Sequence, residues 1–303
     1  MKDEKLEAAY AECRAIARRE AKNFYYAFVA LPEPRRDAIC AIYAFMRQAD
    51  DLADDESLPR EERQRRLDAW QADWRGVCHG GDSSDLVFYA VRDAVERYTI
   101  PLNLLDELVA GVTMDLKRAA DDEPDTYATF IDLYRYCYLV ASVVGLVCIR
   151  IFGYQDPRAE KLAEETGIAF QLTNILRDVA EDAQRNRIYL PLEDLAVHKV
   201  SLDSLLHRRA AAPATENELA LLKEIGKRAE VYYQSAQALM PLIDRESRPA
   251  LWVLVAIYHD LLKQIERADY DVFSRRASVP TLKKLAILTV GLVRMGWARV
   301  VGF

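Results

Sequence analysis

The chain of 303 residues has few of the residues that break helices, with only 11 glycines and 11 prolines. Segments of alternating apolar and polar residues, which predict half-buried strands, are scarce, whereas apolar residues recur at helical spacing throughout. The sequence shows no internal repeat, low-complexity tract or linker. These features predict an all-α fold organised as a single domain over residues 1–303.

Several classes of protein leave no signature in this sequence. It has no phosphate loop of the GxGxxG or GxxxxGKS type, and its five cysteines form no CxxC pair. A net charge of −7 argues against a nucleic-acid partner, because such proteins concentrate Lys and Arg. The N-terminus lacks an apolar signal core, and the longest uncharged apolar run, residues 139–149, is too short to span a bilayer. We therefore expect a cytoplasmic enzyme.

The pattern of apolar residues predicts several long helices. A first helix is expected over residues 5–28, and a second begins near Pro34 and ends before Pro59. Residues 127–152 are apolar on nearly every side and predict a single, central helix.

Two rows of acidic residues, each at helical spacing, are the most informative feature. In the first acidic row, Asp50 and Asp54 lie four residues apart, and Arg47 precedes them by one turn. The second acidic row lies in the stretch QLTNILRDVAED, residues 171–182. Its members share one helix face: Asn174, Asp178 and Asp182, with Gln171 one turn earlier.

Each row allows two interpretations. Acidic residues four apart usually form a solvated helix face. The flanking sequence is mostly apolar, however, and carboxylates one turn apart repel each other unless a cation neutralises them. Carboxylate and amide oxygens suit Mg²⁺, which binds a few protein oxygens together with phosphate oxygens of a substrate. The rows therefore favour a divalent metal site.

With both rows in view, the chain resembles the squalene/phytoene synthase family over nearly its whole length. The resemblance rests on several stretches in a specific order: FYYAF at 24–28, AIYAFMRQADDLADD at 41–55, LYRYCYLVASVVG at 133–145, QLTNILRDVAED at 171–182, RIYLP at 187–191, Tyr258, and DYDVFSRR at 269–276. The resemblance implies an isoprenoid synthase-type helical bundle with a central active-site cavity. It also implies an Mg²⁺- or Mn²⁺-dependent prenyltransferase that joins two allylic prenyl diphosphates head to head.

The same resemblance implies roles for individual residues. The implied metal ligands are Asp50, Asp54, Asn174, Asp178 and Asp182, and four of these, the aspartates, are also counted as catalytic. Tyr136 is implied in proton transfer, and Tyr258 in supplying a hydroxyl near the diphosphate. The implied diphosphate ligands are Arg47, Arg177 and Arg275, with Gln171 supporting the metal ligands. The implied walls for the prenyl tails are Phe24, Phe28, Tyr43 and residues 141–145. Taken singly, these residues could equally be surface arginines, buried tyrosines or ordinary core.

The identity of the substrate depends on which branch of the family the chain resembles. Residues 140–145 and 151–154 favour a bacterial presqualene diphosphate synthase that uses two farnesyl diphosphates, on the route to squalene and hopanoids. DYDVFSRRA equally resembles a 15-cis-phytoene synthase that uses two geranylgeranyl diphosphates. We expect the farnesyl substrate, no use of NADPH, and a downstream isoprenoid enzyme as partner. A non-catalytic assembly factor of the same fold and a terpene cyclase are the alternatives.

The C-terminal segment combines basic and apolar residues. Lys283, Lys284, Arg294 and Arg299 flank a run of nine uncharged residues, 285–293, which cannot span a bilayer. A helix of this composition either packs on the core or lies peripherally at the inner face of the membrane. The sequence leaves both alternatives open.

Overall fold

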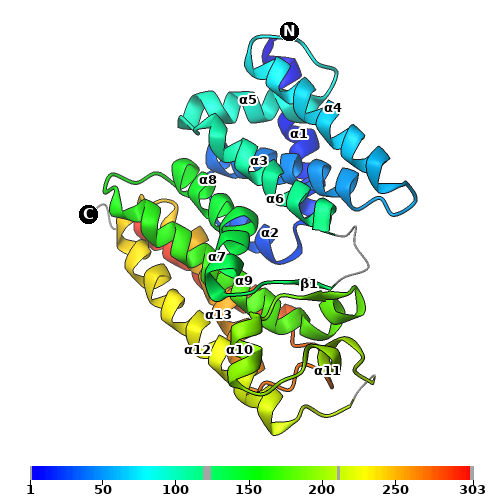
Figure 1. Cartoon of the computed structure of the whole chain (residues 1–303). Helices are drawn as coiled ribbons and strands as arrows, with labels where there is room; N and C mark the ends of the chain where they lie inside the picture. Colours follow the sequence, from blue (N-terminus) through cyan, green and yellow to red (C-terminus); the bar gives the residue numbers. More distant parts are fainter. Residues whose placement is uncertain (1, 119–123, 210–211, 301–303) are drawn as a thin grey trace.

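The computed structural model describes residues 2–118, 124–209 and 212–300, and helices form most of this part of the chain (Figure 1). The predicted all-α fold is confirmed. The helices of the N-terminal part are α1 (Lys2–Glu20), α2 (Lys22–Val29), α3 (Glu33–Ala53), α4 (Arg60–Cys78), α5 (Leu86–Tyr98) and α6 (Leu102–Arg118).

The C-terminal part contains the longest helix and a short parallel pair of strands. Its helices are α7 (Phe130–Cys137), α8 (Val143–Phe152), α9 (Arg158–Gln184), α10 (Leu192–Val197), α11 (Leu202–Leu206), α12 (Glu216–Leu239), α13 (Arg248–Arg267) and α14 (Thr281–Val300). A π-helical turn (Tyr138–Ser142) joins α7 to α8. Strand β1 (Asp125–Thr126) pairs in parallel with β2 (Arg187–Ile188).

Two predicted helix boundaries were wrong. The helix expected over residues 5–28 is broken at Ala21, because its two parts pack on different partners: α1 lies against α3 and α5, and α2 lies against α13. The helix expected over residues 127–152 begins at Phe130 and contains the π-helical turn. Such turns insert an extra residue into a helix and often occur at functional sites.

The π-helical turn lies directly against α9 at a glycine. A Cβ atom on Gly167 would stand 2.5 Å from the Cα of Ser142 and 2.7 Å from its backbone nitrogen. The Ser142 hydroxyl donates a hydrogen bond to the Glu164 carbonyl at 2.6 Å. Two backbones can approach this closely only where a side chain is absent.

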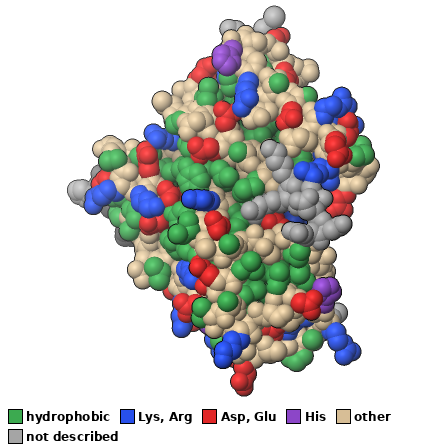
Figure 2. All heavy atoms as spheres, viewed as in Figure 1, with side chains coloured by type: hydrophobic (Ala, Val, Ile, Leu, Met, Phe, Trp, Pro, Cys, Tyr) green, Lys and Arg blue, Asp and Glu red, His purple; other side chains and the backbone are tan. Residues whose placement is uncertain are grey.

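Buried residues form two adjoining cores. One extends from α1, α3 and α5 to α8 and α13 and includes Phe45, Trp74 and Phe88, against which Trp70 packs. The other surrounds α9 and α12, whose contact is the most extensive in the chain. Phe24, Leu254 and Val255 pack against both cores. In Figure 2, hydrophobic side chains gather across the middle of the face shown, with charged side chains of both signs around them.

One helical stretch, Phe130–Phe152, is long and apolar enough to cross a membrane by length and composition. Core helices of soluble proteins have the same properties. Here the stretch contacts α9, α6 and α3, in agreement with the predicted central position.

We predict that Gly167→Ala lowers the free energy of unfolding by about 1–3 kcal/mol, because the added methyl group overpacks the contact between α9 and the π-helical turn. The matched control is Gly76→Ala in α4, where a Cβ would meet no atom within 4 Å. That variant should leave stability unchanged or raise it by up to ~1 kcal/mol. Urea denaturation of both variants measures the difference, and equal stabilities would contradict the proposed close packing.

Candidate active site

A cavity of about 350 Å³ lies between α2, α3, α8, α9 and α13. Most of its lining is apolar, including Phe28, Ile42, Val144 and Leu254. Polar side chains gather at one end, which we call the polar end: Arg47, Asp50, Gln171, Asn174 and the hydroxyl of Tyr258. This combination can hold a molecule with a long hydrocarbon part and an anionic head.

The direction of the helices explains why the polar groups meet. Along α3 the lining begins at Ile39 and ends at Asp50, and along α9 it begins at Ala163 and ends at Asn174. Each span covers twelve residues, or about 16 Å of helix from the first to the last. Both helices therefore run from the apolar part of the cavity to its polar end.

The first acidic row lies at the end of α3. Arg47 and Asp50 line the cavity, and Arg47 is ion-paired with Asp51. Asp54 is exposed and caps the helix, with its backbone N–H donating to the Asp50 carbonyl at 2.8 Å. The row therefore starts in the cavity and continues to the surface.

The second acidic row begins at the polar end with Gln171 and Asn174. The Asn174 side-chain nitrogen donates to Gln171 Oε1 at 3.4 Å and also interacts with the Tyr258 hydroxyl. Its carbonyl oxygen, Oδ1, is buried without a hydrogen-bond partner among the described residues. A buried acceptor without a donor is costly, and it is the kind of atom that a cation would satisfy.

Asp178, one turn further along α9, is held by two arginines. Arg177 Nη2 lies 2.5 Å from Asp178 Oδ2, and Arg276 Nη2 lies 2.7 Å from Oδ1. Burial acts to raise the pKa of Asp178, but these two partners hold it below its ordinary value. Asp182, a further turn along, has its pKa raised to about 7 by burial and by the nearby Asp178. At this end of α9, two arginines therefore compensate the charge of Asp178, whereas burial and repulsion disfavour the charged form of Asp182.

Aromatic rings line the wall next to the polar end. Tyr258 stacks on Phe170 with centroids 4.5 Å apart and contacts Phe24 at 5.6 Å. Phe28 meets Tyr43 edge to face at 6.0 Å. Burial raises the pKa of Tyr258 to about 12, so its hydroxyl stays protonated at neutral pH. The predicted wall residues Phe24, Phe28 and Tyr43 all line the cavity.

Six predicted site residues are not among the described residues that line the cavity. Four of them, Asp54, Arg177, Asp178 and Asp182, follow the lining residues along α3 and α9. The other two lie elsewhere. Tyr136 is buried in the second core, where it stacks on Tyr189 at 5.0 Å, and it is not among the described residues that line the cavity. Arg275 is exposed, whereas its neighbour Arg276 reaches Asp178. The predicted roles of Tyr136 and Arg275 stay predictions.

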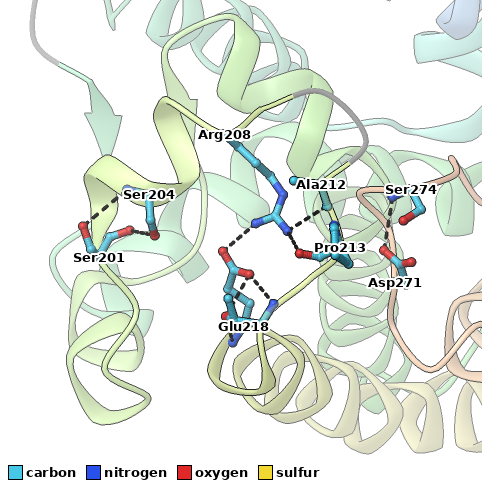
Figure 3. Close-up of polar contacts among 9 residues, drawn as sticks. Ser201, Ser204, Arg208, Ala212, Pro213, Glu218, Asp271 and Ser274 are labelled. Carbon is cyan, nitrogen blue, oxygen red and sulfur yellow. Dashed lines mark hydrogen bonds and ion pairs between the residues drawn. The ribbon is translucent and has the colours of Figure 1, made fainter.

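Figure 3 shows a buried ion pair between Arg208 and Glu218 next to the loop of Asp271 and Ser274, which continues to Arg276. Arg208 Nη1 lies 2.6 Å from Glu218 Oε1, and both side chains are largely buried. Arg208 also donates to the carbonyls of Ala212 and Pro213 and lies 3.7 Å over the ring of Phe273. Arg208 therefore fixes Phe273, three residues before Arg276.

The described residues contain no group of three His, Cys, Asp or Glu side chains placed to hold a metal ion by themselves. Asp50 and Asn174 nevertheless bring oxygen atoms to one end of the cavity from two helices. This donor set fits Mg²⁺, which binds one or two carboxylates together with substrate phosphates.

Sequence reasoning missed Phe170, Arg276 and the bracing residue Arg208. Phe170 could have been found, because it precedes Asn174 by one turn and so shares its helix face. Arg208 has no such local signal, because its partners are set by the tertiary fold.

Comparison with known proteins bears on this site. The family model described as "Squalene/phytoene synthase" matches residues 17–283. The chain belongs to the squalene/phytoene synthase family. It is 36% identical to a 15-cis-phytoene synthase of Synechococcus elongatus, covering 95% of this chain and 94% of the relative. It is also 34% identical to phytoene synthase 3, chloroplastic, of Zea mays, and this match covers 95% of this chain and 66% of the relative.

Solved structures of the family have the same fold. A dehydrosqualene synthase crystallised with a ligand matches with a TM-score of 0.82 and 29% identity, over 98% of this chain and 99% of that one. The squalene synthase HpnC of Alicyclobacillus acidocaldarius matches with a TM-score of 0.78 and 26% identity, over 88% of this chain and 96% of that one. The predicted isoprenoid synthase-type fold and family are confirmed, and with them the class of the enzyme, a prenyltransferase.

We predict that Arg208→Met destabilises the protein by about 3 kcal/mol, because it leaves the buried Glu218 carboxylate without its cation. The matched control is Arg209→Met, which changes an exposed arginine next to it and should shift stability by less than ~0.5 kcal/mol. Thermal and urea denaturation of both variants give the comparison. A stability loss no larger for Arg208→Met than for Arg209→Met would contradict the bracing role.

Proposed function

We propose that this enzyme joins two geranylgeranyl diphosphates head to head to form 15-cis-phytoene. The observation that carries the reaction class is an apolar cavity whose polar end is lined by Asp50 of the first acidic row, on α3, and by Gln171 and Asn174 of the second, on α9. The names of the relatives, phytoene synthases 36% and 34% identical, support the C20 substrate. They favour it over the farnesyl diphosphate expected from the sequence.

The proposed chemistry begins when an allylic C–O bond breaks and the diphosphate leaves with the electron pair. Asp50 and Asn174, with Asp54, Asp178 and Asp182 further along their helices, would hold Mg²⁺. When bound, the metal supplies a Lewis acid for the departing diphosphate. Arg47 and Arg177 would donate hydrogen bonds to diphosphate oxygens, a role suited to the planar guanidinium group.

The apolar part of the cavity would hold the prenyl tails and exclude water from the allylic cation. The stacked pair Tyr258 and Phe170, together with Phe24, presents aromatic rings to this region. Each ring face can stabilise a nearby cation by about 0.5–2 kcal/mol. Burial raises the pKa of the Cys148 thiol, also in the wall, to about 12. That thiol therefore stays neutral and does not compete as a nucleophile.

We predict that Asp54→Asn and Asp178→Asn each lower the rate by at least ~10³, equivalent to about 4 kcal/mol of transition-state stabilisation. The expected cause is the loss of an anionic metal ligand. Product formation is measured with Mg²⁺ and again after chelation, which should abolish activity of the unmodified enzyme.

The matched control is Asp68→Asn, on the exposed face of α4, which should retain full activity. Thermal denaturation of each variant separates loss of function from loss of fold. Near-normal activity of both site variants would contradict the assignment of Asp54 and Asp178 as metal ligands, and no turnover by the unmodified protein would support a non-catalytic assembly role.

A second candidate substrate is farnesyl diphosphate, because structural neighbours include a dehydrosqualene synthase and a squalene synthase. We predict that purified enzyme with Mg²⁺ converts the C20 diphosphate to a C40 hydrocarbon without NADPH, and that mass spectrometry detects it. Formation of a C30 product from the C15 substrate, with none from the C20 substrate, would assign the enzyme to the squalene branch.

A further inference from the structure

Helix α14 exposes an apolar stripe to solvent. Six exposed residues recur at helical spacing and span roughly 140° of the helix surface: Leu282, Leu285, Ala286, Thr289, Val290 and Val293. The one hydroxyl among them, on Thr289, donates to the Leu285 carbonyl within the helix. We call this set the outer stripe of α14. Single exposed apolar residues are common on proteins, but a continuous stripe marks an interaction surface.

The opposite face of α14 is packed on the protein. Ile287, Leu288 and Leu292 lie against the first core, and α14 contacts α13 and α2. A Cβ on Gly291 would stand 2.4 Å from a methyl group of Val253, so the glycine permits close contact with α13. The two alternatives left open by the sequence are therefore compatible, because the inner face packs while the outer stripe remains free.

The charged residues of α14 and of residues 272–280 before it are all basic. Residues 272–303 contain six Lys and Arg and no Asp or Glu, in a chain of net charge −7. Asp260, the acidic residue that reaches α14, is ion-paired with Lys283 at the start of the helix and lies 3.8 Å from Arg267. Arg294 lies over the ring of Trp252 at 4.1 Å. A basic helix with an apolar stripe suits a surface that is both apolar and anionic.

Helix α14 also lies next to the cavity. The two helices on which it packs supply part of the cavity wall, α2 through Phe24 and Phe28 and α13 through Leu251 and Leu254. The chain reaches α14 from Arg276, which contacts the second acidic row. A partner bound to the outer stripe would therefore be separated from the cavity only by α14 and by the helices α2 and α13 on which it packs.

We propose that the outer stripe of α14 docks the protein on the surface of an anionic lipid bilayer, with the helix lying in the interface. A second copy of the chain is a poorer partner, because a symmetric contact would bring two basic segments together without acidic residues to pair with them. The inference goes beyond the proposed reaction and does not depend on the length of the prenyl substrate.

The test is co-sedimentation of the full-length protein with vesicles of phosphatidylcholine, with and without phosphatidylglycerol, at low and high salt. We expect binding to the anionic vesicles at low salt and partial loss at high salt, because screening weakens the charge contribution but not the apolar one. The double substitution Leu285→Gln with Val293→Gln should weaken binding at least fivefold, since it removes apolar groups from the stripe.

The matched control is the double substitution Ile131→Gln with Val231→Gln, at side chains that are 66% and 61% exposed, compared with 61% for Val293. It should bind as the unmodified protein does. Activity on substrate supplied in detergent micelles should be equal in all three proteins, which separates docking from catalysis. Three results would overturn the proposal: no binding to anionic vesicles at low salt, equal loss in the control variant, or a dimer in solution that the stripe substitutions dissociate.

Discussion

The close contact between α9 and the π-helical turn determines where the parts of the site lie. Gly167 allows the two backbones to touch at Ser142, and Gln171 and Asn174 follow on α9 within the next two turns. The residues just before Ser142, Val140 and Ala141, also line the cavity. One contact without a side chain thus holds two neighbouring parts of the cavity lining together.

Beyond the polar end, two arginines hold Asp178 of the second acidic row in place. Asp178 is held between Arg177 and Arg276, and Arg276 depends on a loop braced by Arg208. The ion pair between Arg276 and Asp178 links α9 to a loop 98 residues further along the chain. The site is therefore a product of tertiary structure as much as of the α9 sequence.

How far the sequence predicted this arrangement depends on the range of the interactions involved. The acidic rows were found because helical spacing alone puts Asp50 and Asp54, or Asn174 and Asp178, on one face. The π-helical turn was missed because its sequence, YLVAS, contains no glycine or proline, and only packing against α9 distinguishes it from an ordinary helix. Arg276 was not separated from Arg275, because neighbouring residues of a loop point in directions that the local sequence does not specify.

The ends of α3 and α9 have a further electrostatic consequence. Asp50 lies in the last turn of α3 and Asp182 in the last turn of α9, and neither last turn contains a basic residue. The carboxyl end of a helix carries a partial negative charge from its unpaired carbonyl groups, and it favours cations over anions. The helix dipoles therefore add to the negative potential of the carboxylates, and this region attracts cations before any substrate binds. A cation bound there would reduce the repulsion between the carboxylates of the folded chain. It would therefore raise the free energy of unfolding as well as assist the reaction.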